Sequence, residues 1–195
     1  MDMPFDAMAE MSDETLLVLF ANGDGAAARA LNLRLTPRVM GHAYRLLGNH
    51  AEAEDVTQEA MLRLWKIAPE WRQDEAKVTT WLYRVVANLC IDLRRRARGV
   101  ALESIPEPED GRATAAEILQ DAARAEALQE ALDQLPDRQR QAVVLRHIEG
   151  LANPEIAEIM EITTEAVESL TARGKRALTA ALSGRQEELG YGDER

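Results

Sequence analysis

One predicted helix in the first half of the chain carries side chains suited to binding nucleic acid. At about 3.6 residues per turn, Arg84, Asn88 and Arg95 fall on one face, and Arg94 adjoins them at its end. Arginine binds phosphate, and asparagine can hydrogen-bond the edge of a base. Trp81 lies close by, and aromatic rings beside cations suit bases that have left a duplex. These residue types and spacings predict a nucleic-acid-binding surface.

The same residues also have a simpler structural explanation. Cations at the end of a helix stabilise its dipole, so Arg94 and Arg95 do not require a ligand. A tryptophan such as Trp81 is more often a core residue than a binding one. Trp71 and Tyr83 are also aromatic and lie near Trp81 in the sequence, where they could take part in binding bases. The apolar face of this helix is expected to lie in the core, and it comprises Leu82, Val85, Val86, Leu89, Cys90 and Leu93.

A helix over residues 55–66 carries one apolar side chain on its polar face. The core face is expected to hold Val56, Thr57, Ala60, Met61 and Leu64, and the opposite face Asp55, Gln58, Glu59, Leu62 and Lys66. A single exposed leucine is ordinary in a folded protein. However, an apolar anchor with an acidic rim also suits docking to a basic partner.

Two short helices near the C-terminus have the pattern of a helix-turn-helix. Asn153 and Pro154 predict the start of the first helix, as N-cap and first helical residue, and Thr163 can cap the second. The second helix presents a polar face of Glu165, Glu168, Ser169, Ala172 and Arg176, with Arg173 at its edge; its buried stripe is Ala166, Val167, Leu170, Gly174, Ala177 and Leu178. An ordinary helical hairpin would give the same pattern.

Helical periodicity over most of the chain predicts an all-α fold of two small domains. We expect disordered residues 1–11, a domain over 12–98, a flexible acidic linker with prolines over 99–114, a domain over 115–183 and a charged tail over 184–195. The formal net charge of -11 argues against a protein that binds DNA unaided, because phosphate contacts supply most non-specific affinity. It is compatible with DNA binding within a larger assembly.

The sequence lacks the residues that several other classes of function require. The chain has no paired carboxylates, nucleophile with its base, or glycine-rich phosphate loop, so we expect no catalytic residues and no cofactor. Cys90 is the single cysteine and the three histidines are scattered, so we expect no disulfide and no metal site. The N-terminus is not a signal peptide, and no apolar run approaches the roughly 18 residues of a membrane span. A cytoplasmic protein without membrane insertion is expected.

Two blocks of residues resemble bacterial RNA polymerase sigma factors of the compact extracytoplasmic-function group. Glu54–Glu59, Leu64–Trp65 and Thr80–Asn88 resemble sigma domain 2, and Leu135–Arg140, Leu145–Arg146, Glu149–Leu151, Glu155–Ala157 and Ala166–Val167 resemble sigma domain 4. The resemblance covers about residues 12–98 and 128–182. It implies an alternative sigma factor, with core RNA polymerase and promoter DNA as partners and a role in stress responses.

The resemblance also implies roles for individual residues. Core-polymerase contacts would be Asp55, Gln58, Glu59 and Leu62; −10 contacts would be Trp81, Arg84, Asn88, Arg94 and Arg95; −35 contacts would be Thr164, Glu165, Glu168, Ser169, Ala172, Arg173 and Arg176. The loop from Pro69 to Lys77 is where this family holds a base flipped from the melted strand. A cognate anti-sigma factor covering the polymerase-binding face is a further implied partner.

The chain departs from the family pattern at three positions. Glu161 stands in the inter-helix turn where glycine is frequent, and a left-handed conformation there would cost about 1 kcal/mol. Glu168 and Leu170 stand where basic residues are usual, which implies an unusual −35 sequence.

The alternative function is a free-standing dimeric helix-turn-helix regulator, which would bind duplex DNA without polymerase.

Overall fold

The computed structural model describes residues 8–72, 77–99, 117–183 and 185. Within these residues the regular elements are all helical, which confirms the predicted fold class. The chain divides into two compact units, Met1–Arg94 and Arg95–Arg195. The predicted linker, apart from residue 99, lies outside the described residues, as do residues 115 and 116 and all of the charged tail except Arg185.

The first unit is a group of helices whose starts are fixed by side-chain caps. Ser12 accepts a hydrogen bond from the Thr15 amide, and Asp24 accepts one from the Ala26 amide at 2.8 Å. Each cap satisfies an amide that has no partner inside its helix. The elements are α2 (Asp13–Ala21), α3 (Gly25–Leu47), α4 (His50–Ile67), a 3-10 turn (Ala68–Glu70) and α5 (Val78–Gly99), whose last turn runs past the unit boundary at Arg94.

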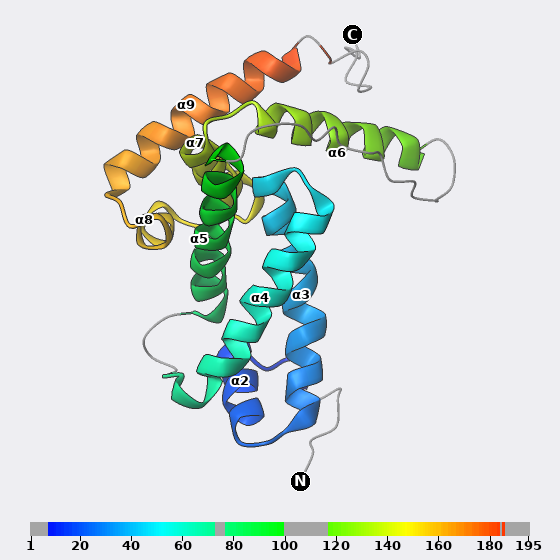
Figure 1. The fold of residues 1–195 in the computed structure, drawn as a ribbon, viewed down its shortest axis with the longest axis vertical. Helices are drawn as coiled ribbons and strands as arrows, with labels where there is room; N and C mark the ends of the chain where they lie inside the picture. The colour runs from blue at the N-terminus through cyan, green and yellow to red at the C-terminus, as the bar shows by residue number, and fades with distance from the viewer. Residues whose placement is uncertain (1–7, 73–76, 100–116, 184, 186–195) are drawn as a thin grey trace. The chain divides into compact units, whose positions relative to one another are not determined.

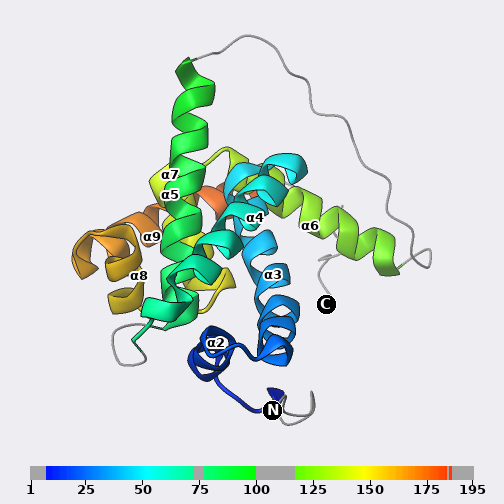
Figure 2. The same cartoon turned by 60° about the horizontal axis from the view of Figure 1, so that its bottom comes forward.

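Helices α3 and α4 lie side by side as an antiparallel pair (Figures 1 and 2). Gly48 ends α3 with φ of 72°, and Asn49 caps α4 by accepting from the Glu52 amide at 3.0 Å. Positive φ suits glycine because it lacks the Cβ that would clash there. The fully buried core residues of the pair include Leu31, Leu35, Ala43, Ala53 and Leu64.

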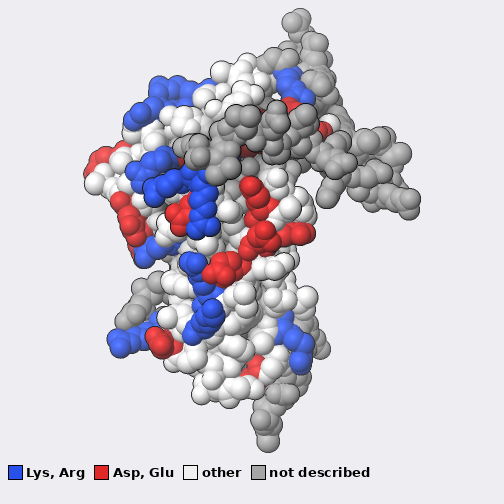
Figure 3. All heavy atoms as spheres, viewed as in Figure 1, with Lys and Arg blue, Asp and Glu red and all other residues white. Residues whose placement is uncertain are grey.

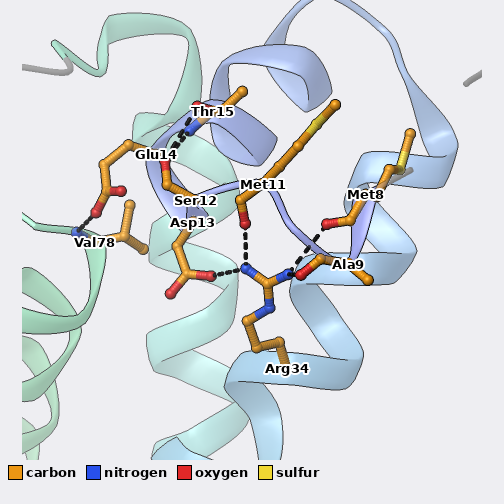
Figure 4. A network of polar contacts seen from close by, with 9 residues as sticks. All are labelled: Met8, Ala9, Met11, Ser12, Asp13, Glu14, Thr15, Arg34 and Val78. Atoms are coloured by element: carbon orange, nitrogen blue, oxygen red, sulfur yellow. Dashed lines mark hydrogen bonds and ion pairs between the residues drawn. The ribbon is translucent and has the colours of Figure 1, made fainter. Parts of the chain in front are cut away.

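An arginine fastens the N-terminal segment to this unit (Figure 4). The Arg34 guanidinium donates to the carbonyl oxygens of Met8 and Met11 and pairs with the Asp13 carboxylate at 2.7 Å. Met8 is completely buried. The prediction that residues 1–11 are disordered is therefore wrong for Met8 to Met11; residues 1–7 lie outside the described part.

The second unit contains α6 (Glu117–Asp133), α7 (Asp137–Val143), a π turn (Val144–Ile148), α8 (Asn153–Met160) and α9 (Thr164–Ser183). Arg140 is buried at the corner between α6 and α7. Its guanidinium donates to the Asp133 carbonyl at 2.7 Å and to the Leu135 carbonyl at 3.3 Å. These bonds satisfy carbonyl groups left open at the end of α6 and so hold the corner.

Helices α7 and α9 approach each other closely at Gly174. A Cβ built on Gly174 would lie 2.5 Å from Cγ2 of Val143 and 3.2 Å from the Gln139 carbonyl oxygen. Any larger residue would have to push the helices apart. The absence of a side chain at Gly174 therefore sets the α7–α9 packing distance.

The start of α8 differs from the sequence prediction by one residue. Ala152, not Asn153, is the N-cap, and Asn153 and Pro154 occupy the first turn. The Ala152 amide donates instead to the Glu155 carboxylate at 3.0 Å. Asn153 donates to the Glu168 carboxylate of α9 at 3.4 Å, so its side chain links two helices.

No helix within the described residues is long and apolar enough to cross a membrane. The described side chains also include no group of three or more metal-ligating residues.

Candidate protein and nucleic-acid interfaces

The exposed face of α4 has the composition that its periodicity predicts. Val56, Ala60 and Leu64 are buried, whereas Leu62 on the other side of the helix has 52% of its surface exposed. The sequence prediction of the helix phase is therefore confirmed.

Acidic side chains precede Leu62 along this helix, and Figure 3 shows acidic side chains gathered over the N-terminal half of α4. Asp55 and Gln58 are exposed, and Glu59 is half-buried. Glu59 accepts from Arg63 at 2.7 Å, one turn further along. An exposed pair of this kind contributes little stability, so it leaves the acidic rim available to a partner.

The polar face of α5 presents both cations and an amide. Asn88 and Arg95 are exposed, and Arg84 is half-buried. Arg94 is held differently, because it donates to the Leu47 carbonyl at the end of α3 at 3.4 Å. That bond gives Arg94 a structural role in addition to any contact with DNA. Ile91 on the same face is 39% exposed.

Two tryptophans lie together beside the start of α5. The rings of Trp71 and Trp81 meet edge to face with centroids 6.1 Å apart, and both are half-buried. Tyr83 is only 2% exposed and packs on His42 with ring centroids 4.6 Å apart. The suggestion that Tyr83 receives bases is therefore wrong, since its ring lies in the core.

Helix α9 exposes most of the polar face that the sequence predicts. Exposed side chains are Glu165, Glu168, Ser169, Ala172, Arg173 and Arg176, and Thr164 is half-buried. Ser169 accepts from Arg173 at 2.6 Å, which orients that guanidinium along the helix. Of the predicted buried stripe, Val167 and Gly174 are buried but Ala177 is exposed, so the stripe is narrower than predicted.

The turn between α8 and α9 is left-handed at a residue other than glycine. Glu161 has φ of 53° and ψ of 50°, and the Ile162 amide donates to the Ala157 carbonyl at 3.1 Å. Thr163 then caps α9 by accepting from the Ala166 amide at 3.3 Å. The geometry is that of a tight helix-turn-helix corner closed by hydrogen bonds at both helix ends.

Known proteins share both halves of this arrangement. The family model for Sigma-70 region 2 matches residues 33–100, and that for Sigma-70, region 4 matches residues 125–178. The ECF RNA polymerase sigma factor SigE of Mycolicibacterium smegmatis is 35% identical over 189 residues, covering 92% of this chain and 72% of the relative. The chain belongs to the ECF sigma factor family. This membership displaces the alternative of a free-standing dimeric regulator.

Further comparisons agree that this chain is an ECF sigma factor. The ECF sigma factor SigW of Bacillus subtilis is 33% identical over 150 residues, covering 71% of this chain and 80% of the relative. The sigma factor RpoE of Bartonella quintana, solved in complex with the anti-sigma factor NepR, has a TM-score of 0.63 at 21% identity. That match covers 78% of this chain and 94% of the other, and it supports the fold.

Sequence reasoning missed one residue that borders the α5 site. Glu14 of α2 accepts a hydrogen bond from the Val78 amide at 3.0 Å, across 64 positions of the chain. The local sequence gives no signal of this bond, because its two partners are far apart along the chain.

Proposed function

We propose that this sigma factor docks on core RNA polymerase through the exposed face of α4 and directs initiation at specific promoters. The observation that carries the proposal is Leu62, an exposed leucine on an acidic face within the segment that matches Sigma-70 region 2. Such a residue can anchor in an apolar pocket while Asp55, Gln58 and Glu59 meet a basic or polar rim. The chain supplies recognition, and the polymerase supplies catalysis in the cytoplasm.

The −10 element would be read by α5 and the residues before it. Arg84 and Arg95 are placed to bind phosphates, and the exposed amide of Asn88 can contact a base edge. The Trp71–Trp81 pair flanks the segment that would hold a flipped base, with Trp81 forming one apolar wall. Arg94 would contribute from its position against the end of α3.

The −35 element would be read by α9, whose exposed polar face can enter a major groove. Arg173 and Arg176 would bind phosphates or guanine, and Glu165 can accept from cytosine. The pKa of Glu165 is lowered by its own backbone amide and by the Thr163 hydroxyl, so it is an acceptor at neutral pH. Glu168 is engaged by Asn153, and Thr164, Ser169 and Ala172 would complete the face.

DNA recognition is tested by selecting from a randomised duplex pool with core polymerase and this chain. The proposal predicts two enriched sequence blocks, absent when polymerase is used alone. Arg176→Ala should weaken binding to the selected duplex by about 1–3 kcal/mol if it contacts a base. Arg29→Ala removes an equally exposed cation from α3 and should have no such effect. Equal affinity of the two variants would contradict the assignment of α9.

A regulatory partner is part of the same proposal. A solved relative is bound to an anti-sigma factor, and a protein that covered Leu62 or α9 would prevent polymerase or promoter contact here. Affinity purification of the chain from its source cells should recover a small second protein without polymerase subunits. Recovery of polymerase in every preparation, and never of such a protein, would count against this regulation.

A further inference from the structure

The first amide of helix α5 is bound by a residue from a distant part of the chain. The first amides of a helix have no partner within it, and a serine, threonine, aspartate or asparagine usually supplies one. Here the preceding residue is Lys77, whose ammonium group only donates. The Lys77 carbonyl accepts the first helical bond, from the Trp81 amide at 3.1 Å. A capping side chain at this position would in any case reach the second or third helical amide, so the Val78 amide, which is the first, takes its acceptor from another element.

Glu14 supplies that acceptor from α2 (Figure 4). Its Oε1 lies 3.0 Å from the Val78 nitrogen, and the Val78 side chain is completely buried. A carboxylate at a helix start also interacts favourably with the helix dipole. Burial raises the pKa of Glu14, but hydrogen bonds from the Val78 amide, its own amide and Ser12 outweigh this and lower the pKa overall. The group is therefore charged at neutral pH.

The helix that carries Glu14 is held firmly on both of its sides. Asp13, the adjacent residue, pairs with Arg34 of α3 at 2.7 Å. Phe20 at the other end of α2 packs edge-on against Trp65 of α4, with ring centroids 4.7 Å apart. Glu14 thus reaches α5 from an element that is fixed to both α3 and α4. A carboxylate on such an element can transmit their position to α5.

Val78 lies between Trp71 and Trp81 in the sequence, the two tryptophans proposed to contact the melted DNA strand. Trp71 precedes the segment before α5, and Trp81 lies in its first turn, so the position of that turn sets the Trp71–Trp81 pair. Helix α2 lies outside residues 33–100, the segment matched to Sigma-70 region 2. We infer that Glu14 is a positioning residue for promoter opening, because it fixes the start of α5 and hence the place of Trp81. This inference rests on the proposed role of α5 in reading the −10 element.

The test compares Glu14→Ala with Glu10→Ala in the full chain bound to core polymerase. Glu10 is an exposed acid just before α2, so its loss matches the change in charge. The substrate is a duplex selected from a randomised pool by the wild-type holoenzyme and labelled with 2-aminopurine in the opened segment. Loss of one helix cap corresponds to about a fivefold fall in the equilibrium constant for opening. Core-polymerase affinity should be unchanged in both variants.

A second substitution adds a local cap to α5 without a link to α2. The side-chain oxygen introduced by Lys77→Asn would reach the second and third amides of α5 and not that of Val78, so Glu14→Ala with Lys77→Asn should open no more duplex than Glu14→Ala alone. Lys77→Asn alone measures the effect of losing the lysine. Glu14→Gln keeps an acceptor oxygen without the charge and should fall between wild type and Glu14→Ala.

The outcomes separate this inference from the function on which it rests. Normal opening by Glu14→Ala, or its restoration by Lys77→Asn, would overturn the positioning role. Equal loss of polymerase affinity and opening in Glu14→Ala would also overturn it, because general unfolding would then explain the defect. If the wild-type chain itself neither binds polymerase nor opens any duplex, the proposed function fails first.

Discussion

Replacing Glu161 with glycine should stabilise the second unit. Glu161 holds φ of 53° and ψ of 50°, a conformation that costs an L-residue about 1–2 kcal/mol. Glycine avoids that cost. However, glycine loses more conformational entropy on folding than other residues, which lowers the free energy of unfolding by about 0.5–1 kcal/mol. The midpoints of these two ranges differ by about 0.75 kcal/mol, so the expected gain corresponds to about 3–6 °C in Tm for a domain of this size.

The distribution of tryptophan allows this change to be assigned to one unit. Trp65, Trp71 and Trp81 are the three tryptophans of the chain, and all lie in the first unit. Thermal unfolding followed by far-ultraviolet circular dichroism reports on both units, whereas tryptophan fluorescence reports on the first alone. Glu161→Gly should raise the circular-dichroism transition of the second unit and leave the fluorescence transition in place.

The matched control is Glu161→Ala, which removes the same charge but keeps the unfavourable backbone conformation. A carboxylate near a helix C-terminus opposes the helix dipole, so alanine alone should gain a few tenths of a kcal/mol, about 0.3. Glycine must exceed alanine for the conformational explanation to hold. Equal transitions for the two variants would refute the reasoning, and a lower Tm for Glu161→Gly would show that the Glu161 side chain stabilises the turn.

Two other substitutions or treatments have clear expectations. Gly174→Ala should destabilise the second unit by about 1–3 kcal/mol, because the new Cβ would lie 2.5 Å from Cγ2 of Val143. An unchanged midpoint of unfolding in urea would show that α7 and α9 move apart without loss of stability. Burial raises the pKa of Cys90 to about 12, so its thiol should react with a thiolate-selective reagent at pH 8 far more slowly than in urea. Equal labelling rates would place Cys90 at the surface.

Local patterns predicted the helices of this chain well. Thr163 caps α9 as predicted, because a cap depends on residues only three positions apart. The exposed position of Leu62 follows from periodicity alone, since one side of α4 packs and the other does not.

Contacts between distant residues were beyond sequence reasoning. Met8 is buried because Arg34 reaches back to its carbonyl, and no local pattern in the first residues signals that bond. Tyr83 is in the core because His42 from α3 packs on it. Glu14 binds the first amide of α5 from 64 positions away, beyond the reach of any local pattern. Tertiary packing decided each of these cases.

The most direct test of polymerase docking is size-exclusion chromatography with bacterial core RNA polymerase. Wild type is compared with Leu62→Asp and with Leu33→Asp, which makes the same change at an exposed leucine of α3. Both variants should keep the wild-type circular dichroism, because both leucines are exposed. Wild type and Leu33→Asp should elute with polymerase, and Leu62→Asp should not. Elution of folded Leu62→Asp with polymerase, at the wild-type ratio, would contradict docking through α4.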